Sequence, residues 1–346
     1  MRKLHAITIA ASVCAPVIAS TPVMGATKIY GELHASFDKL DADSSAVSNA
    51  DTLSLNSSVL GVKGLQNVNK NLNFIYNFEV GFQSDRGVES TAEGLVNSNK
   101  DLIENRNQVI GLAGKFGAVI VGRYDTPFKT LGAKADLFWH SQLGQNRNLT
   151  NPSQWDLRAD RIVVYQTPRL DGFQGTVAYS SDIGDAADSS VFSANGIYII
   201  GDFRVGAAYE RQDLDNVNAE PNAIRLMTRY QKGPFTVVGF YQNENNETKE
   251  TGIADATVFG VGAAYRIGKG KIKGQYYSRD VSGTSNDPDL LAIGYDYRIA
   301  KKTDVYAQFA RVTEGYRLGG ADHGSGVYST TSGDADGVSL GVRYKF

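Results

Sequence analysis

The sequence GVSLGVRYKF at residues 337–346 alternates strictly between two kinds of side chain. One face carries only apolar or aromatic residues, namely Val338, Leu340, Val342, Tyr344 and Phe346. The other face carries serine, glycine, arginine and lysine. Successive side chains of a β-strand point to opposite faces, so this period of two predicts a strand. One face of that strand must contact an apolar phase, and the other must contact water.

The same alternation recurs upstream in KIKGQYYSR (271–279), LAIGYDYR (291–298), FRVGAAYE (203–210) and VFGVGAAYRI (258–267). In the first of these, Lys271, Lys273, Gln275 and Arg279 share one face. The dry core of a soluble sheet would not accept such side chains without partners, because burying an unpaired charge is costly. The polar faces are therefore expected to line a wet space.

Sixteen segments of this kind can be placed along the chain. They start near residues 28, 53, 72, 104, 117, 160, 173, 191, 202, 222, 234, 256, 270, 289, 303 and 337. Tight turns such as GKFG (114–117) and GKG (268–270) alternate with long polar connections such as 314–336. Short connections at one end and long ones at the other are typical of a transmembrane antiparallel β-barrel. The fold class predicted is therefore all-β, with sixteen strands closed into a barrel.

Composition favours the same fold over its alternatives. The 346 residues include 37 Gly, 18 Tyr and 15 Phe but only 3 Met, and many aromatic residues sit near the ends of the expected strands. Aromatic residues in those positions match the girdles of a membrane barrel. A soluble β-sandwich or β-propeller is the alternative. No repeat of about 40 residues with a blade signature is visible, which disfavours the propeller.

The first residues have the layout of a secretory signal peptide. Arg2 and Lys3 precede an apolar stretch from Leu4 to Ala19, and small residues follow up to Ala26. We therefore expect a cleaved signal peptide over 1–26 and a single mature domain over 27–346. Cleavage removes the only cysteine, and it leaves 33 of the 35 Lys+Arg against 37 Asp+Glu, a net charge of −4. This acidic balance disfavours a nucleic-acid partner.

Four stretches together resemble the general porins of Gram-negative outer membranes: TKIYGELHASFD (27–38), SSVLGVKGL (57–65), RNQVIGLAGKFGAVIVGRYDTPF (106–128) and the terminal GVRYKF. The likeness covers the whole mature chain and rests on the order and spacing of these motifs. It implies a sixteen-stranded barrel that assembles as a homotrimer in the outer membrane, among lipids and lipopolysaccharide. It also implies that Phe346 is an insertion signal read by the barrel-assembly machinery.

The resemblance further implies that the third loop folds into the lumen and forms a constriction. The longest connection, residues 126–159, supports this independently because it holds both tryptophans, Trp139 and Trp155. A long loop with an aromatic centre is more often functional than unstructured. A surface loop or a subunit contact is the alternative.

Ion selectivity in a pore depends on the charges at its narrowest point. The resemblance places Arg106 at a wall arginine of such porins. The remaining constriction candidates, from the loop and its flanks, are Arg123, Asp125, Lys129, Lys134, Asp136, Arg158 and Arg161. Where the family often carries another arginine, this chain has Val59. Residues 123–161 nevertheless hold six basic and four acidic side chains, which favours a weak preference for anions.

No enzymatic function is expected. The mature chain has only His34, His140 and His323, none in a nucleophile motif, and no clustered ligands indicate a metal or cofactor. The predicted function is passive diffusion of ions and small hydrophilic solutes. A channel devoted to one substrate class, or a barrel for surface recognition, is the alternative.

Overall fold

The computed structural model describes residues 27–43, 50–82, 88–91, 94–97, 103–138, 142–150, 155–183, 189–214, 219–246, 254–285, 287–319, 326–328 and 333–346. The expected signal peptide over 1–26 lies outside these residues, as do Trp139, His140 and His323. No helix in the described ranges is long and apolar enough to span a membrane.

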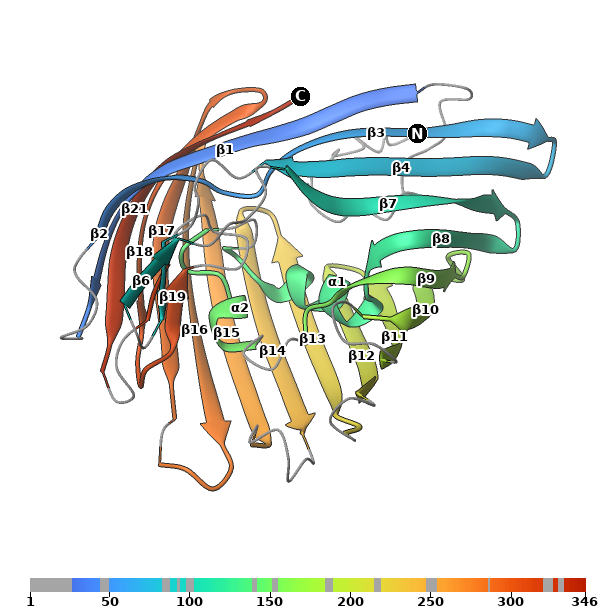
Figure 1. The fold of residues 1–346 in the computed structure, drawn as a ribbon. Coiled ribbons are helices and arrows are strands. Elements are labelled where there is room, and N and C mark those ends of the chain that lie inside the picture. Colours follow the sequence, from blue (N-terminus) through green and yellow to red (C-terminus); the bar gives the residue numbers. More distant parts are fainter. Residues whose placement is uncertain are drawn as a thin grey trace.

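Sixteen antiparallel crossings form one closed barrel (Figure 1), as predicted. In chain order they are β1 (Thr27–Ala42), β2 with β3 as one interrupted crossing (Ala50–Leu55 and Ser58–Asn69), β4 (Leu72–Phe82), β7 (Ile103–Gly114), β8 (Gly117–Asp125), β9 (Arg158–Gln166), β10 (Phe173–Asp182), β11 (Ser189–Ile200), β12 (Phe203–Leu214), β13 (Asn222–Lys232), β14 (Phe235–Asn245), β15 (Ala256–Ile267), β16 (Gly270–Val281), β17 (Asp289–Ala300), β18 (Thr303–Val312) and β21 (Ala335–Lys345). Each predicted start lies within three residues of an observed one.

The last crossing closes the sheet against the first. β21 pairs with β1 from Glu32↔Lys345 to Ala42↔Ala335, and with β18 on its other side. Two short hairpins lie outside the barrel sheet, β5 (Val88–Thr91) with β6 (Gly94–Asn97) and β19 (Arg317–Gly319) with β20 (Gly326–Tyr328). Because β1 and β21 pair with each other, the main sheet has no open edge.

The two faces of the sheet differ as the alternation predicts. In β21, Val338, Leu340 and Val342 are 47, 53 and 43 % exposed, whereas Ser339 on the opposite face is fully buried. Large exposed apolar side chains occur on every one of the sixteen crossings. A continuous apolar outer surface of this kind suits a hydrocarbon phase rather than water.

Aromatic residues gather on the outer face near the short turns. Phe203 of β12 lies 4.7 Å from Tyr230 of β13, measured between ring centroids, and Phe235 of β14 lies 4.6 Å from Tyr265 of β15. These pairs come from neighbouring strands at the same end of the barrel. They form part of an aromatic girdle at the level expected for a membrane interface.

Candidate pore constriction

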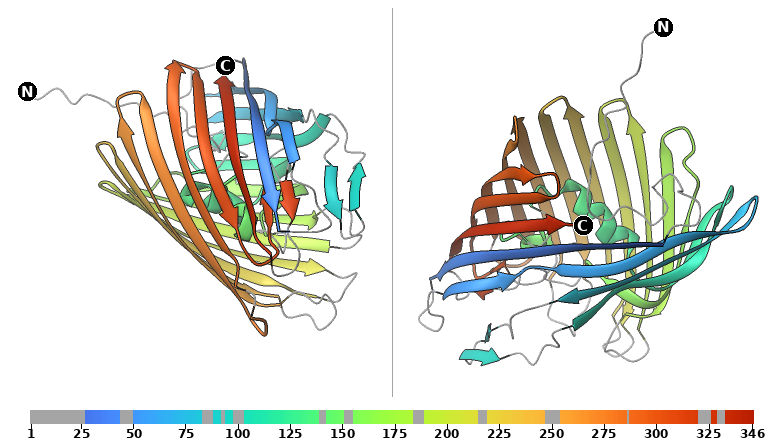
Figure 2. Two further views of the ribbon diagram at one scale, coloured as in Figure 1. Left: turned by 90° about the vertical axis from the view of Figure 1, so that its left-hand side faces the viewer. Right: turned by 90° about the horizontal axis from the view of Figure 1, so that it is seen from above.

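The connection between β8 and β9 occupies the barrel interior (Figures 1 and 2). It begins at Thr126, whose hydroxyl caps α1 (Pro127–Ala135) by accepting a hydrogen bond from the Lys129 backbone N–H at 3.3 Å. Pro127 suits the first turn because its missing N–H would have no helical partner there. After α1 the chain forms α2 (Arg147–Thr150) and returns to the wall at β9. We call residues 126–157 the inner loop.

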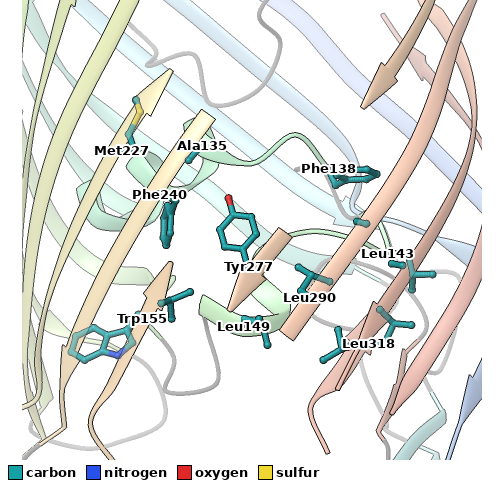
Figure 3. Packing of buried hydrophobic residues seen from close by; sticks show 14 of the residues in the cluster. Ala135, Phe138, Leu143, Leu149, Trp155, Met227, Phe240, Tyr277, Leu290 and Leu318 are labelled. Atoms are coloured by element: carbon teal, nitrogen blue, oxygen red, sulfur yellow. The ribbon is translucent and has the colours of Figure 1, made fainter. Parts of the chain in front are cut away.

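Apolar side chains fix the inner loop to the wall between β12 and β18. The large apolar loop residues that are fully buried are Phe128, Leu131, Phe138, Leu143, Leu149 and Trp155. They pack against Met227, Phe240, Tyr277 and Leu290 of the strands (Figure 3). Burying one such side chain contributes about 1.5–3 kcal/mol. The loop is therefore held in place along much of its length.

Small residues on the wall make room for this packing. A Cβ atom at Gly206 of β12 would lie 2.5 Å from Leu131 Cδ1, and one at Gly294 of β17 would lie 2.9 Å from Phe138 Cε1. Ala292 of β17 lies against Gly144 of the loop in the same way. The glycine and alanine on these inward faces thus set how close the loop can approach the wall.

Buried polar contacts add specific anchors. Arg225 of β13 is fully buried, and its Nη1 donates to Asp156 Oδ1 at 2.8 Å and to the Phe128 carbonyl at 3.0 Å. Its guanidinium also stacks on the Phe128 ring, 4.0 Å from the centroid. Gln242 of β14 accepts from Arg225 Nε at 2.8 Å. One strand arginine therefore joins both ends of the inner loop.

A second arginine anchors α2. Arg279 of β16 forms a two-pronged pair with Glu244 of β14, at 2.6 and 2.8 Å, and donates to the Leu149 carbonyl at 3.1 Å. On the same face of β16, four residues earlier, Gln275 donates to Asp136 Oδ1 at 2.8 Å and accepts from the Leu137 N–H at 2.9 Å. Bidentate pairs of this kind are directional, so they fix position as well as charge.

The charges predicted for the constriction meet where the loop leaves and rejoins the wall. Asp125 at the end of β8 lies 2.9 Å from Lys129 Nζ and 3.1 Å from Arg158 Nε, and Arg158 begins β9. Nearby on β7, Arg106 Nε lies 2.9 Å from Glu79 Oε1 of β4. The structure thus brings Arg106, Asp125, Lys129 and Arg158 into one wall cluster.

The other candidates lie elsewhere. Arg123 pairs with Asp160, and Lys134 Nζ donates to the Thr130 carbonyl at 3.0 Å within α1. Arg161 is not brought to the wall cluster: its side chain is 75 % exposed and pairs with Asp182 at 2.6 Å. A left-handed backbone at Arg161 (φ 46°) interrupts the alternation of β9, so that Ala159 and Ile162 both face inward and Arg161 does not.

The side chain of Asp136, a loop residue, lies between the loop and the wall instead of facing the open lumen. It is 6 % exposed and accepts hydrogen bonds from the N–H groups of Phe138 and Asn146, each at 2.8 Å, besides the one from Gln275. Burial raises the pKa of Asp136, and these donated hydrogen bonds partly offset the rise. Its role is to tie two parts of the loop together.

Comparison with known proteins decides the family. A family model described as Gram-negative porin matches residues 6–316. The chain belongs to this family. Among relatives, it is 27 % identical to the major outer membrane protein P.IB of Neisseria meningitidis over 362 residues, covering all of this chain and 99 % of the relative.

Solved porin structures share the fold. An anion-selective porin from Comamonas acidovorans superposes with a TM-score of 0.78 at 21 % identity, covering 93 % of this chain and 99 % of the other. A trimer form of OmpT from Vibrio cholerae superposes with a TM-score of 0.69 at 17 % identity, again covering 93 % and 99 %.

These findings confirm the predicted family, the outer-membrane location and the function as a diffusion channel. The porin is a channel and not an enzyme. In the described part of the chain, no group of three or more His, Cys, Asp or Glu side chains could hold a metal ion.

The sequence prediction missed the strand residues that anchor the inner loop. Gln275 and Arg279 were visible as part of the polar face of KIKGQYYSR, but nothing in that pattern named their partners. Arg225 lies in IRLMTRY, where alternation alone marks it as inward-facing.

Filling the wall beneath the loop should change the pore. We expect Gly294→Val to displace Phe138 and the loop with it, because a side chain there meets the ring closer than van der Waals contact allows. The measurement is single-channel conductance. Gly274→Val is the matched control, since a Cβ on that glycine of β16 lies no closer than 3.5 Å to any other residue. Equal conductance in both variants would contradict the assigned packing.

Removing the Arg225 anchor should loosen the loop. Arg225→Gln removes a positive charge that helps to neutralise the buried carboxylate of Asp156. Breaking such a buried pair costs about 3–5 kcal/mol. We expect a red shift of tryptophan emission at denaturant concentrations that leave the wild-type loop packed, because Trp155 is buried in that loop. Arg211→Gln breaks an exposed pair with Glu220 and should change little.

Proposed function

We propose that the inner loop sets the narrowest part of this porin and that the wall cluster around Arg106 governs which ions pass. One observation carries the proposal: the described residues of the connection pack inside the barrel against β12 to β18. A sixteen-stranded barrel is otherwise wide enough to leave an aqueous channel. The loop therefore narrows the lumen from the side of β12 to β18.

The wall cluster supports a role in selectivity. Arg106 and Glu79 are 14 and 12 % exposed, and Asp125, Lys129 and Arg158 are still less exposed. Charges held in a fixed, partly dehydrated arrangement act on a passing ion more strongly than charges surrounded by bulk water. Small hydrophilic solutes and ions are the cargo that such an opening admits.

A weak preference for anions fits the wall cluster, in which Arg106, Lys129 and Arg158 stand against Glu79 and Asp125. The porin from Comamonas acidovorans is described as anion-selective, which supports the same preference in this chain. Assembly as a homotrimer is supported by the trimer form of OmpT. Lipids and lipopolysaccharide would then surround the trimer.

The C-terminal residue is proposed as a recognition signal for the barrel-assembly machinery. Phe346 completes the seam: its N–H donates to the Gly31 carbonyl at 3.0 Å, and its carbonyl accepts from the Gly31 N–H at 3.3 Å. Its ring lies against Gly31 on the outer face and stacks with Tyr344, 5.9 Å between centroids.

Reversing the charge at Arg106 should move selectivity towards cations. Arg106→Glu places a carboxylate beside Glu79, and a unit charge 4 Å from an ion acts with about 4 kcal/mol at an effective dielectric near 20. The reversal potential across a salt gradient measures the shift. Lys301→Glu, the same change in an exposed short turn, should leave it nearly constant. An unchanged potential in Arg106→Glu would place the constriction elsewhere.

Deleting Phe346 should impair outer-membrane assembly more than its burial explains. The lost apolar contact is worth only about 1.5–3 kcal/mol, which a large barrel tolerates. Tyr344→Ala removes a comparable outward aromatic from the same strand and is the control. Assembled protein in outer-membrane fractions is the readout. Similar yields from both variants would remove the recognition role.

A further inference from the structure

Two inward-facing arginines stand opposite each other near the short-turn end of the barrel. Arg204 of β12 and Arg229 of β13 are direct cross-strand partners. Arg204 lies on the same inward face of β12 as Gly206, and Arg229 lies on the same inward face of β13 as Met227. A third arginine, Arg169 in the turn between β9 and β10, is close enough for its charge to act on Arg204.

This cluster has no acidic counterpart among the described residues. Arg169, Arg204 and Arg229 form no ion pair with an acidic side chain in that part of the chain, and the charges of Arg204 and Arg229 repel each other. Asp202, in the adjoining turn, lies instead 3.9 Å from Lys232. Like charges directly opposite on paired strands are destabilising, so the pairing of Arg204 with Arg229 costs free energy.

Two other inward arginines, on β13 and β16, behave differently. Arg225 and Arg279 are each neutralised by a carboxylate, Asp156 and Glu244, and each anchors the inner loop. Arg229 contacts the loop only through one hydrogen bond, from Nη1 to the Lys134 carbonyl at 3.2 Å. A guanidinium has five N–H donors, so most of the donors of Arg229 remain for another acceptor.

We propose that Arg204 and Arg229, together with Arg169, bind a small oxyanion with two negative charges, such as inorganic phosphate. The planar guanidinium group matches the spacing of two oxygens on such an anion, and a doubly charged anion offsets two neighbouring arginines at once. The site lies on the inner wall at the short-turn end, beside the end of α1 that carries Lys134 (Figure 1).

The binding site goes beyond selectivity at the constriction and does not depend on where the lumen is narrowest. Short turns face the periplasm in bacterial barrels of this kind. The arginine pair would therefore hold anions at the periplasmic mouth, below the inner loop. A doubly charged anion would occupy it more strongly than chloride at equal ionic strength.

The test is the effect of potassium phosphate on chloride current through the full-length porin in planar bilayers, at constant ionic strength. We expect phosphate to reduce the current with saturation. Arg204→Gln should raise the half-saturating phosphate concentration by about tenfold, as expected for loss of one charge-assisted bidentate contact. The current of each variant in phosphate is normalised to its own current in chloride alone, so a change in basal conductance does not enter the comparison. Arg204→Lys keeps the positive charge but loses the planar guanidinium, so its half-saturating phosphate concentration should lie between those of the wild type and Arg204→Gln.

Lys232→Gln is the matched control, because it removes one positive charge at the same end of β13 from an exposed position. It should leave the phosphate effect unchanged. A phosphate effect that is absent, or that responds equally to Lys232→Gln and Arg204→Gln, overturns the site. A phosphate effect lost in Arg106→Glu but kept in Arg204→Gln also overturns it, while leaving the proposed constriction intact.

A second readout covers the case in which a variant inserts poorly. Phosphate should raise the thermal unfolding temperature of the detergent-solubilised wild type relative to chloride, because a ligand that binds only the folded state stabilises it. Arg204→Gln should unfold no earlier than wild type without phosphate, since it relieves repulsion, and phosphate should no longer stabilise it. A phosphate shift that persists in Arg204→Gln contradicts the proposal.

Discussion

A backbone that crosses hydrocarbon must satisfy every N–H and C=O from within, and the rest of this structure depends on that constraint. Sixteen strands meet it by closing into a barrel, with β21 paired to β1 along the seam. Closure puts the apolar side chains outside and leaves a polar interior too wide for side chains to fill. The inner loop exists within that interior, and its shape follows from the wall that surrounds it.

Inside the barrel, the loop is fixed by two different kinds of force. Apolar packing around Phe138 and Trp155 supplies most of the burial, but it is not directional. Arg225 and Arg279 supply direction, because a buried guanidinium must keep its carboxylate and carbonyl partners in place. The lumen is then divided: the wall from β12 to β18 carries the loop, and Arg106 lies outside that wall, on β7.

The strands were predictable because one face contacts lipid and the other contacts water, and a period of two records this directly. The inner loop was predictable as a long segment between GRYD and the next strand. Its partners were not, since Arg225 and Asp156 are 69 residues apart and meet only through the curvature of the barrel. Arg161 shows a further limit, because its left-handed backbone breaks the alternation between Ala159 and Ile162, and nothing in the sequence marks this break. The opposition of Arg204 and Arg229 likewise depends on strand register.

The small residues at Gly206, Ala292 and Gly294 give the channel a property of their own. The opening is what remains when the thickness of the loop and its clearance from the wall are subtracted from the barrel diameter. Each clearance is set by a small residue on a strand that is distant from the loop in sequence. A mutation in the loop or in the wall beneath it can therefore alter the aperture. A change in one would be compensated by a change in the other, at a distant position in the sequence. Evolution can tune the width of this porin in small steps without redesigning either the loop or the barrel.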